Sequence, residues 1–227
     1  MSITSRKQEF ISKSKKFDFN DFYPILHAPE DEEFFSFKLH SEYFDISLFE
    51  YPKNPIKLMK EVEKKYRYVC PEGNFTPSRK YSQLGLSYQE QYLIQRDWLF
   101  EPWFLLQFCD NYALLKCLKY NKNASKQVTN TSYKWKQVTE DIVGRYVMNG
   151  AAIAAAIALD IPTLNTGELN PYLGVSAKSE KIASKYAQYV RREVSGQYNS
   201  IYKRYNCYLW RSDERLQKKA DTQQIVS

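Results

Sequence analysis

The chain has 227 residues, and its 33 Lys and Arg against 26 Asp and Glu give a formal net charge of +7. Hydrophobic residues make up 43% of it, while only 7 Gly and 9 Pro exclude a collagenous or loop-dominated chain. No apolar run reaches the roughly 18 to 20 residues that a membrane-spanning helix needs.

The N-terminal residues 1–16 carry five basic residues, five Ser or Thr and one acidic residue, without the apolar segment of a secretory signal. We expect a solvated basic tail, with an organelle transit peptide as the alternative. The four cysteines form no CxxC pair, and Cys109 and Cys117 would lie about 12 Å apart along one helix, too far for a disulfide. The expected location is therefore the reducing cytoplasm.

A small α+β lobe is predicted to follow this tail. Apolar and polar residues alternate over 35–48, which predicts a hairpin, with His40 near its turn. Asn54 followed by Pro55 then marks the start of a helix. The lobe is thus expected to be a hairpin plus a helix.

The same lobe is strongly acidic. Residues 18–51 hold nine acids against the single base Lys38. A charged run of this kind is usually a solvated face, but it can also meet a basic partner. The predicted partner-binding residues are Glu30, Asp31, Glu32 and Glu33. The alternative is that the acidic segment packs near the basic C-terminal helix of its own chain or of a neighbouring copy.

A long apolar helix opens the predicted helical domain. Ser87 and Glu90 have the spacing of a capping box, and the apolar pattern continues to about Tyr120. Pro102 predicts a kink or a break in this helix, because proline removes a donor and crowds the preceding turn. Residues 121–137 are polar and basic, and we expect a linker there.

An almost uncharged segment of Ala and Ile belongs to the next predicted helix, from Thr139 to Leu159. A helix without a charged side must be surrounded by protein, so we expect it at the packing centre. The alternative makes residues 141–148 a strand and Asn149-Gly150 a turn into a helix whose N-terminus holds a phosphate. One glycine falls short of the known phosphate-binding motifs, so the first interpretation is preferred.

The C-terminal part carries the whole basic excess, with 16 Lys and Arg against 9 Asp and Glu in residues 121–227. Ser176 is expected to cap a helix that runs to about residue 219, with Ile182, Tyr186 and Val190 on its apolar stripe. In proteins that bind nucleic acid, Lys and Arg side chains contact the phosphate groups, and aromatic rings stack on bases or sugars. The predicted polyanion-binding residues are Lys178, Lys181, Lys185, Arg191, Arg192, Lys203, Arg204, Arg211, Tyr189 and Tyr202.

Few residues in the sequence are candidates for catalysis or for binding a metal ion. His27 and His40 have no Cys or second His at ligand spacing, and both are expected at the surface. Asp45, Glu63 and Lys65 have the residue types of a nuclease site, but Glu63 and Lys65 stand two apart on a predicted helix and would diverge. We therefore predict no catalytic residue, no metal and no cofactor.

These elements predict a mainly α protein, a helical domain with a small N-terminal α+β lobe. The expected parts are a basic tail at 1–16, the lobe at 17–70, a linker loop at 71–86, the helical domain at 87–219 and a flexible tail at 220–227.

The leading functional hypothesis is a non-enzymatic binding protein whose basic, Tyr-rich C-terminal helix engages a polyanion, with nucleic acid as the first candidate. The alternative is a structural or adaptor protein that assembles, as a homo-oligomer or on another acidic protein surface, through its acidic lobe and its basic helix. An enzyme ranks third. All three depend on the Ala/Ile helix being enclosed and the cationic helix facing outward.

Overall fold

The computed structural model describes residues 3–26, 39–77, 82–83, 85–121, 130–164 and 168–194. Its α-helices are α1 (Ile3–Lys15), α3 (Pro55–Lys65), α5 (Tyr88–Asp97), α6 (Pro102–Lys116), α7 (Ser132–Val143), α8 (Asn149–Ala158) and α9 (Ala177–Val194). Three short 3-10 helices are η1 (Phe19–Phe22), η2 (Ile46–Leu48) and η3 (Trp98–Phe100). Across these described ranges, no helix is both long and apolar enough to cross a membrane.

Two short antiparallel hairpins accompany the helices. One pairs β1 (Val69–Cys70) with β2 (Gly73–Asn74), and the other pairs β3 (Thr163–Leu164) with β4 (Tyr172–Leu173). The prediction of a mainly α fold with a small α+β part is confirmed. Both two-stranded sheets follow α3 in the sequence, whereas the region of the predicted hairpin has only isolated bridges in the described residues.

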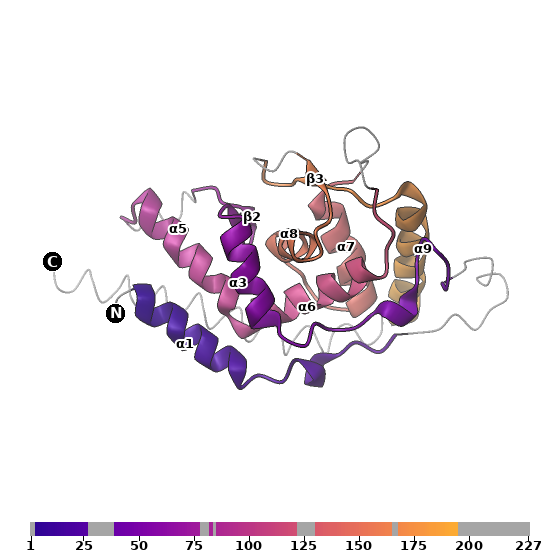
Figure 1. Ribbon diagram of the computed structural model, residues 1–227, viewed down its shortest axis with the longest axis horizontal. Coiled ribbons are helices and arrows are strands. Elements are labelled where there is room, and N and C mark those ends of the chain that lie inside the picture. Colours follow the sequence, from indigo (N-terminus) through magenta and orange to yellow (C-terminus); the bar gives the residue numbers. More distant parts are fainter. Residues whose placement is uncertain are drawn as a thin grey trace.

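Helix α8 lies at the centre of the helical body (Figure 1), and α6, α7 and α3 pack around it. Its residues from Asn149 to Ala156 are all buried. The small side chains let other backbone come very close, and a Cβ on Gly150 would lie 1.8 Å from the carbonyl oxygen of Cys70. The expectation that the Ala/Ile segment forms the packing centre is confirmed.

The single helix predicted from Thr139 to Leu159 is wrong, because α7 and α8 are separate helices. Gly144 ends α7 in a left-handed conformation with φ of 69°, which glycine adopts without steric cost. The linker expected over 121–137 is also shorter than predicted, since α7 already begins at Ser132.

The capping box and the proline break were predicted correctly. Ser87 N–H donates to Glu90 Oε2 at 2.9 Å, and Glu90 N–H donates to Ser87 Oγ at 3.3 Å, at the start of α5. The helix then tightens into η3, and Pro102 stands in the first turn of α6. Because α6 is buried on almost every side, it forms the second central element of the core beside α8.

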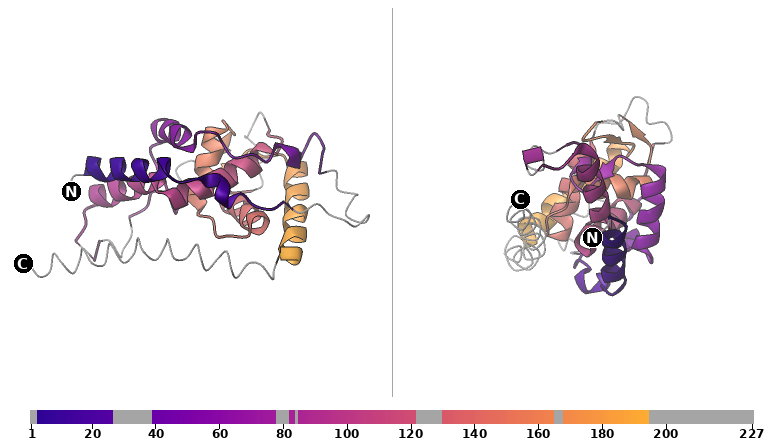
Figure 2. Two further views of the ribbon diagram at one scale, coloured as in Figure 1. Left: turned by 90° about the horizontal axis from the view of Figure 1, so that it is seen from below. Right: turned by 90° about the vertical axis from the view of Figure 1, so that its left-hand side faces the viewer.

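Residues 3–15 form α1 in place of the solvated tail expected there. This helix lies alongside α5 (Figure 2) and also contacts η3, α6 and α3. Ile11 is buried in the common core, and Ser14 Oγ donates to the carbonyl of Phe100 at 2.5 Å. Lys15 is exposed, but Lys7 lies on the side of α1 that faces α3, where it binds Glu63 at 2.6 Å.

The hairpin predicted within 35–48 is confirmed at its turn, where His40 and Asp45 form an isolated antiparallel bridge, but its second half does not continue as a strand. Ile46–Leu48 form η2, because the side chain of Asp45 accepts the N–H of Ser47 at 3.0 Å and starts a helical turn. Phe44 is fully buried and pairs through an isolated bridge with Leu118. Residues 35–38 lie outside the described residues.

Candidate polyanion-binding face

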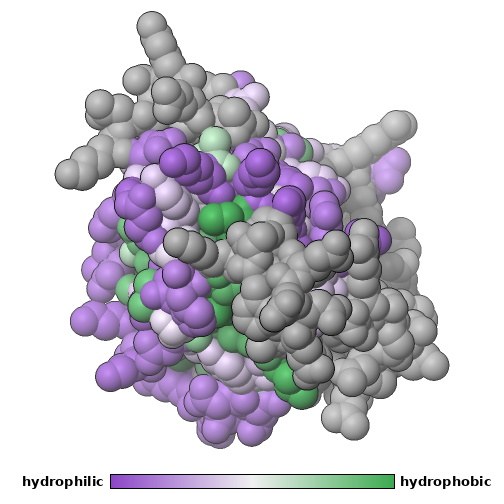
Figure 3. Space-filling view, turned by 90° about the vertical axis from the view of Figure 1, so that its right-hand side faces the viewer, coloured by the Kyte–Doolittle hydropathy of each residue, from purple (hydrophilic) through white to green (hydrophobic). Residues whose placement is uncertain are grey.

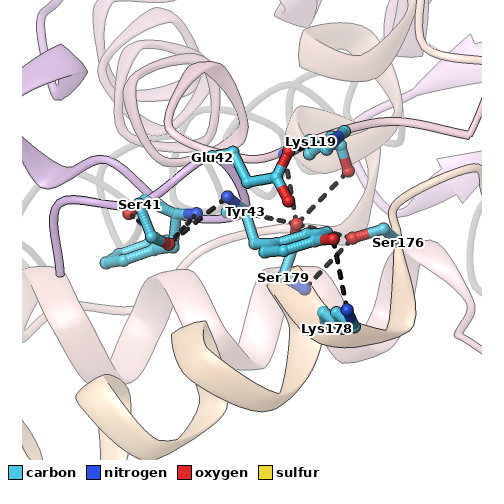
Figure 4. A network of polar contacts seen from close by, with 8 residues as sticks. Ser41, Glu42, Tyr43, Lys119, Ser176, Lys178 and Ser179 are labelled. Carbon is cyan, nitrogen blue, oxygen red and sulfur yellow. Dashed lines mark hydrogen bonds and ion pairs between the residues drawn. The ribbon is translucent and has the colours of Figure 1, made fainter. Parts of the chain in front are cut away.

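The first turn of α9 is fixed by serine hydroxyls (Figure 4). Ser179 N–H donates to Ser176 Oγ at 3.1 Å, so the predicted cap at Ser176 is confirmed. Ser179 Oγ in turn donates to the carbonyl of Tyr43 and accepts the N–H of Lys119 at 3.1 Å. The start of α9 is therefore attached to two segments that lie far away in the sequence.

The basic and apolar sides of α9 point in opposite directions. At about 100° per residue, Ala183, Tyr186 and Val190 fall on one side, and all three are buried. Four basic side chains stand on the rest of the helix and are exposed, namely Lys178, Lys181, Lys185 and Arg191. The prediction that α9 turns its cations outward is confirmed for these four residues.

The remaining predicted polyanion-binding residues have different outcomes. Tyr189 is half-buried and packs against the core, so its ring contributes to packing. Arg192 lies in α9, but its side chain is outside the described residues. Those that lie wholly outside them are Lys203, Arg204, Arg211 and Tyr202.

Seen from the α9 end of the molecule, hydrophilic residues dominate the described surface and border a narrower band of hydrophobic ones (Figure 3). Lys178 Nζ donates to the Tyr43 hydroxyl at 3.2 Å and lies 4.6 Å from the centre of its ring. Arg191 lies 3.7 Å from Asp141 of α7, and its side chain is 70% exposed. Burial raises the pKa of the Asp141 carboxyl, while Arg191 opposes that shift.

A depression of about 730 Å³ lies between α7 and α9, next to Arg191. Its described lining residues are Lys134, Lys136, Gln137, Val138, Glu140, Asp141, Arg145, Tyr146, Ser184, Ala187, Gln188 and Arg191. Lys136 is held by Glu140 at 2.9 Å and by the carbonyl of Val147 at 3.1 Å. Charges of both signs thus meet here, and no histidine stands among these residues.

Arg145, at the inner wall of this depression, belongs to a buried ionic cluster. Its Nε donates to Asp110 Oδ2 at 2.8 Å, its Nη2 to the Tyr51 hydroxyl at 2.6 Å, and its Nη1 to the carbonyl of Phe22 at 2.7 Å. The cluster ties the N-terminal segments to α6 and to the turn between α7 and α8. Sequence reasoning missed it because Arg145 was placed inside a continuous helix.

The phosphate cradle considered at Asn149-Gly150 is contradicted, although α8 does begin at Asn149. Gly150 N–H donates to the carbonyl of Pro71 at 2.8 Å. Asn149 Nδ2 donates to the carbonyl of Leu169 at 3.1 Å and to Asn170 Oδ1 at 2.9 Å. The chain itself closes this end of the helix, which leaves no room for a phosphate.

The candidates for catalysis do not converge. His40 Nδ1 lies 3.1 Å from Asp45 Oδ1, and its side chain is exposed. Glu63 binds Lys7 at 2.6 Å, whereas Lys65 binds Asp160 at 2.8 Å, so the two diverge as predicted. The described residues contain no group of three or more His, Cys, Asp or Glu that could hold a metal ion. His27 lies outside them.

The acidic segment meets basic residues of its own chain. Glu42 binds Lys119 at 2.7 Å, and Glu50 binds Lys116 at 3.0 Å, both near the end of α6. The four predicted partner-binding residues, Glu30, Asp31, Glu32 and Glu33, lie outside the described residues. Of these two acids, Glu42 lies near the start of α9, since the charge of Lys178 also acts on it.

No family model matches this chain, and neither a curated protein nor a solved structure matches it. Relatives therefore supply no function to carry over. The exposed charges of α9 and the contacts around its first turn are the features from which a function can be inferred.

Proposed function

We propose that this protein binds a polyanion, with nucleic acid as the first candidate, through the exposed basic face of α9. The basic face comprises Lys178, Lys181, Lys185 and Arg191. It spans 14 residues of one helix, or about 20 Å, which is long enough to meet several phosphate groups. The observation that carries the proposal is the exposure of these four cations on a helix whose other side is fixed in the core.

The rival hypothesis of an adaptor that matches its acidic lobe to a basic helix on another copy has less support. Glu42 and Glu50 of the acidic segment already form ion pairs with lysines of the same chain. Exposed pairs of this kind contribute little, but they lower the negative charge that the segment offers to a partner. On the basic face of α9, the Arg191 guanidinium lies 3.7 Å from the Asp141 carboxylate and is still 70% exposed.

The test compares two charge reversals of equal size at different places. Lys181→Glu with Lys185→Glu changes the basic face, and Lys57→Glu with Lys60→Glu changes two exposed lysines of α3 by the same charge. Binding of a random-sequence, fluorescently labelled single-stranded oligonucleotide is measured by polarisation between low and physiological salt. The wild-type chain should bind with an affinity that falls steeply with salt. The reason is that the Lys and Arg side chains of the protein displace counterions from the phosphate groups of the oligonucleotide.

The α9 variant should bind more weakly, and the plot of log K against log salt should become less steep by about 0.7 for each phosphate group that the variant no longer neutralises. The α3 variant should keep most of the affinity. Equal decreases in affinity in the two variants would show that net charge alone drives binding, and no binding at low salt would remove the proposal.

A further inference from the structure

Two lysines approach the ring of Tyr43 at the start of α9. Lys119 Nζ lies 4.8 Å and Lys178 Nζ 4.6 Å from the ring centre, and Figure 4 shows the ring between them. Each contact is a cation–π interaction, which positions an ammonium group against the aromatic face. One cation from the segment after α6 and one from α9 are thus held against the same ring, and Lys178 also donates to the Tyr43 hydroxyl at 3.2 Å.

An anion already lies in this cluster, and it belongs to the chain itself. The carboxylate of Glu42 binds Lys119 Nζ at 2.7 Å. Its pKa is lowered first by this bond to Lys119, then by the Tyr43 hydroxyl, and further by the charge of Lys178. The same three side chains that stabilise this carboxylate would stabilise another oxyanion, since carboxylate and phosphate oxygens accept the same charge-assisted bonds.

The backbone beneath the cluster is fixed before any ligand binds. Ser179 of α9 connects the carbonyl of Tyr43 to the N–H of Lys119 through its hydroxyl. A site whose parts are held in place loses less entropy on binding. The Glu42 side chain itself is 62% exposed, and an exposed ion pair of this kind is easily replaced.

We propose that Lys119, Lys178 and Tyr43 form a phosphate site at the start of α9, which the Glu42 carboxylate occupies until a phosphate group displaces it. This inference rests on the proposed polyanion binding and names the position at which one phosphate group of the polyanion binds. A phosphate offers more acceptor oxygens than a carboxylate, so it can reach both lysines at once. The acidic segment then acts as a competitor for the basic face.

The decisive comparison is Glu42→Gln against Glu50→Gln. Both carboxylates are 62% exposed, and both bind a lysine near the end of α6. Glu50 also lies near the charge of Lys53, but it is remote from the Tyr43 ring that Lys119 and Lys178 approach. Glu42→Gln should raise the affinity for the labelled oligonucleotide about two- to fivefold. Glu50→Gln should raise it clearly less. Equal effects of the two substitutions would overturn the proposal.

A second pair of variants tests the cations. Adding Lys119→Gln to Glu42→Gln should abolish the gain in affinity, whereas adding Lys116→Gln should preserve it. Thermal unfolding of each variant checks that the fold is intact. A gain that survives the removal of the Lys119 charge would also overturn the proposal.

Inorganic phosphate separates this inference from the proposed function. In the Glu42→Gln variant, inorganic phosphate should shift the amide resonances of Tyr43 and Ser179 in NMR spectra. Sodium chloride at the same ionic strength should not shift them. If phosphate binds there and the oligonucleotide does not bind at all, the site holds and its ligand is a free phosphate compound. If the oligonucleotide binds but neither Glu42→Gln nor phosphate has these effects, polyanion binding stands and the site is wrong.

Discussion

Gly150 of α8 lies against Cys70 of β1 so closely that a side chain on the glycine would overlap the carbonyl oxygen of Cys70, at 1.8 Å. The substitution Gly150→Ala therefore has two opposing effects on the free energy of unfolding. Helix propensity alone would stabilise the protein by about 1 kcal/mol. The overlap involves backbone, which cannot move aside as a flexible side chain can, and overpacking costs about 1 to 3 kcal/mol or more.

We expect Gly150→Ala to lower the free energy of unfolding, because the overlap outweighs the gain in propensity. Urea unfolding followed by circular dichroism measures the difference. A variant as stable as the wild-type chain, or more stable, would show that β1 and α8 are not in such close contact.

Burial of Asp97 predicts a pH dependence. Its side chain is 6% exposed and its Oδ2 has no hydrogen-bond partner. Burial raises the pKa of this carboxyl from its ordinary 3.8 to about 6, with Lys7 and Arg6 of α1 opposing the shift and Glu63 of α3 adding to it. The folded state thus holds the proton more tightly than the unfolded state, so its contribution to stability falls as the pH rises from about 4 to about 6.

Asp97→Asn should therefore stabilise the protein at pH 7.5 and have little effect at pH 4, as measured by the unfolding midpoint at each pH. Asp45→Asn is the control, because the pKa of Asp45 is lowered, mainly by its bond to Ser47. That variant should lose stability at pH 7.5. The same sign for both variants would contradict a raised pKa for the Asp97 carboxyl.

The buried pair of Arg145 and Asp110 should be costly to break. Arg145 is 3% exposed and Asp110 is fully buried. Replacing Arg145 with Met leaves an uncompensated carboxylate in the core, which costs about 3 to 5 kcal/mol. Tyr51→Phe removes only one hydroxyl from the same cluster and should cost about 1 to 2 kcal/mol. Chemical unfolding of both variants gives the ranking, and a destabilisation below about 1 kcal/mol for Arg145→Met would contradict this account.

Local signals in the sequence predicted several helix boundaries. Ser87 with Glu90, Asn54 with Pro55, and Pro102 each act within one helical turn, so their effect depends little on the rest of the fold. The end of α7 at Gly144 was missed, since one glycine inside a helix costs only about 1 kcal/mol and does not require a break.

The features that could not be predicted depend on contacts between residues that are far apart in the sequence. The break after α7 is accompanied by the pairing of Arg145 with Asp110, 35 residues away. Glu42 and Lys119 are 77 residues apart, and neither residue lies in a motif. The outward direction of the lysines on α9 could be predicted from its apolar period, but the groups around Tyr43 became visible only once three chain segments were placed together.

The docking of α1 supplies the last prediction. Ile11 is buried against the core, while its neighbour Ser12 is exposed on the same helix. Ile11→Asp buries a charge without a partner and should release α1, whereas Ser12→Asp adds the same charge in water. Amide hydrogen exchange in α1 should become much faster in the first variant and stay near the wild-type rate in the second. Equal protection in both variants would mean that the N-terminal residues do not depend on Ile11 for their place beside α5.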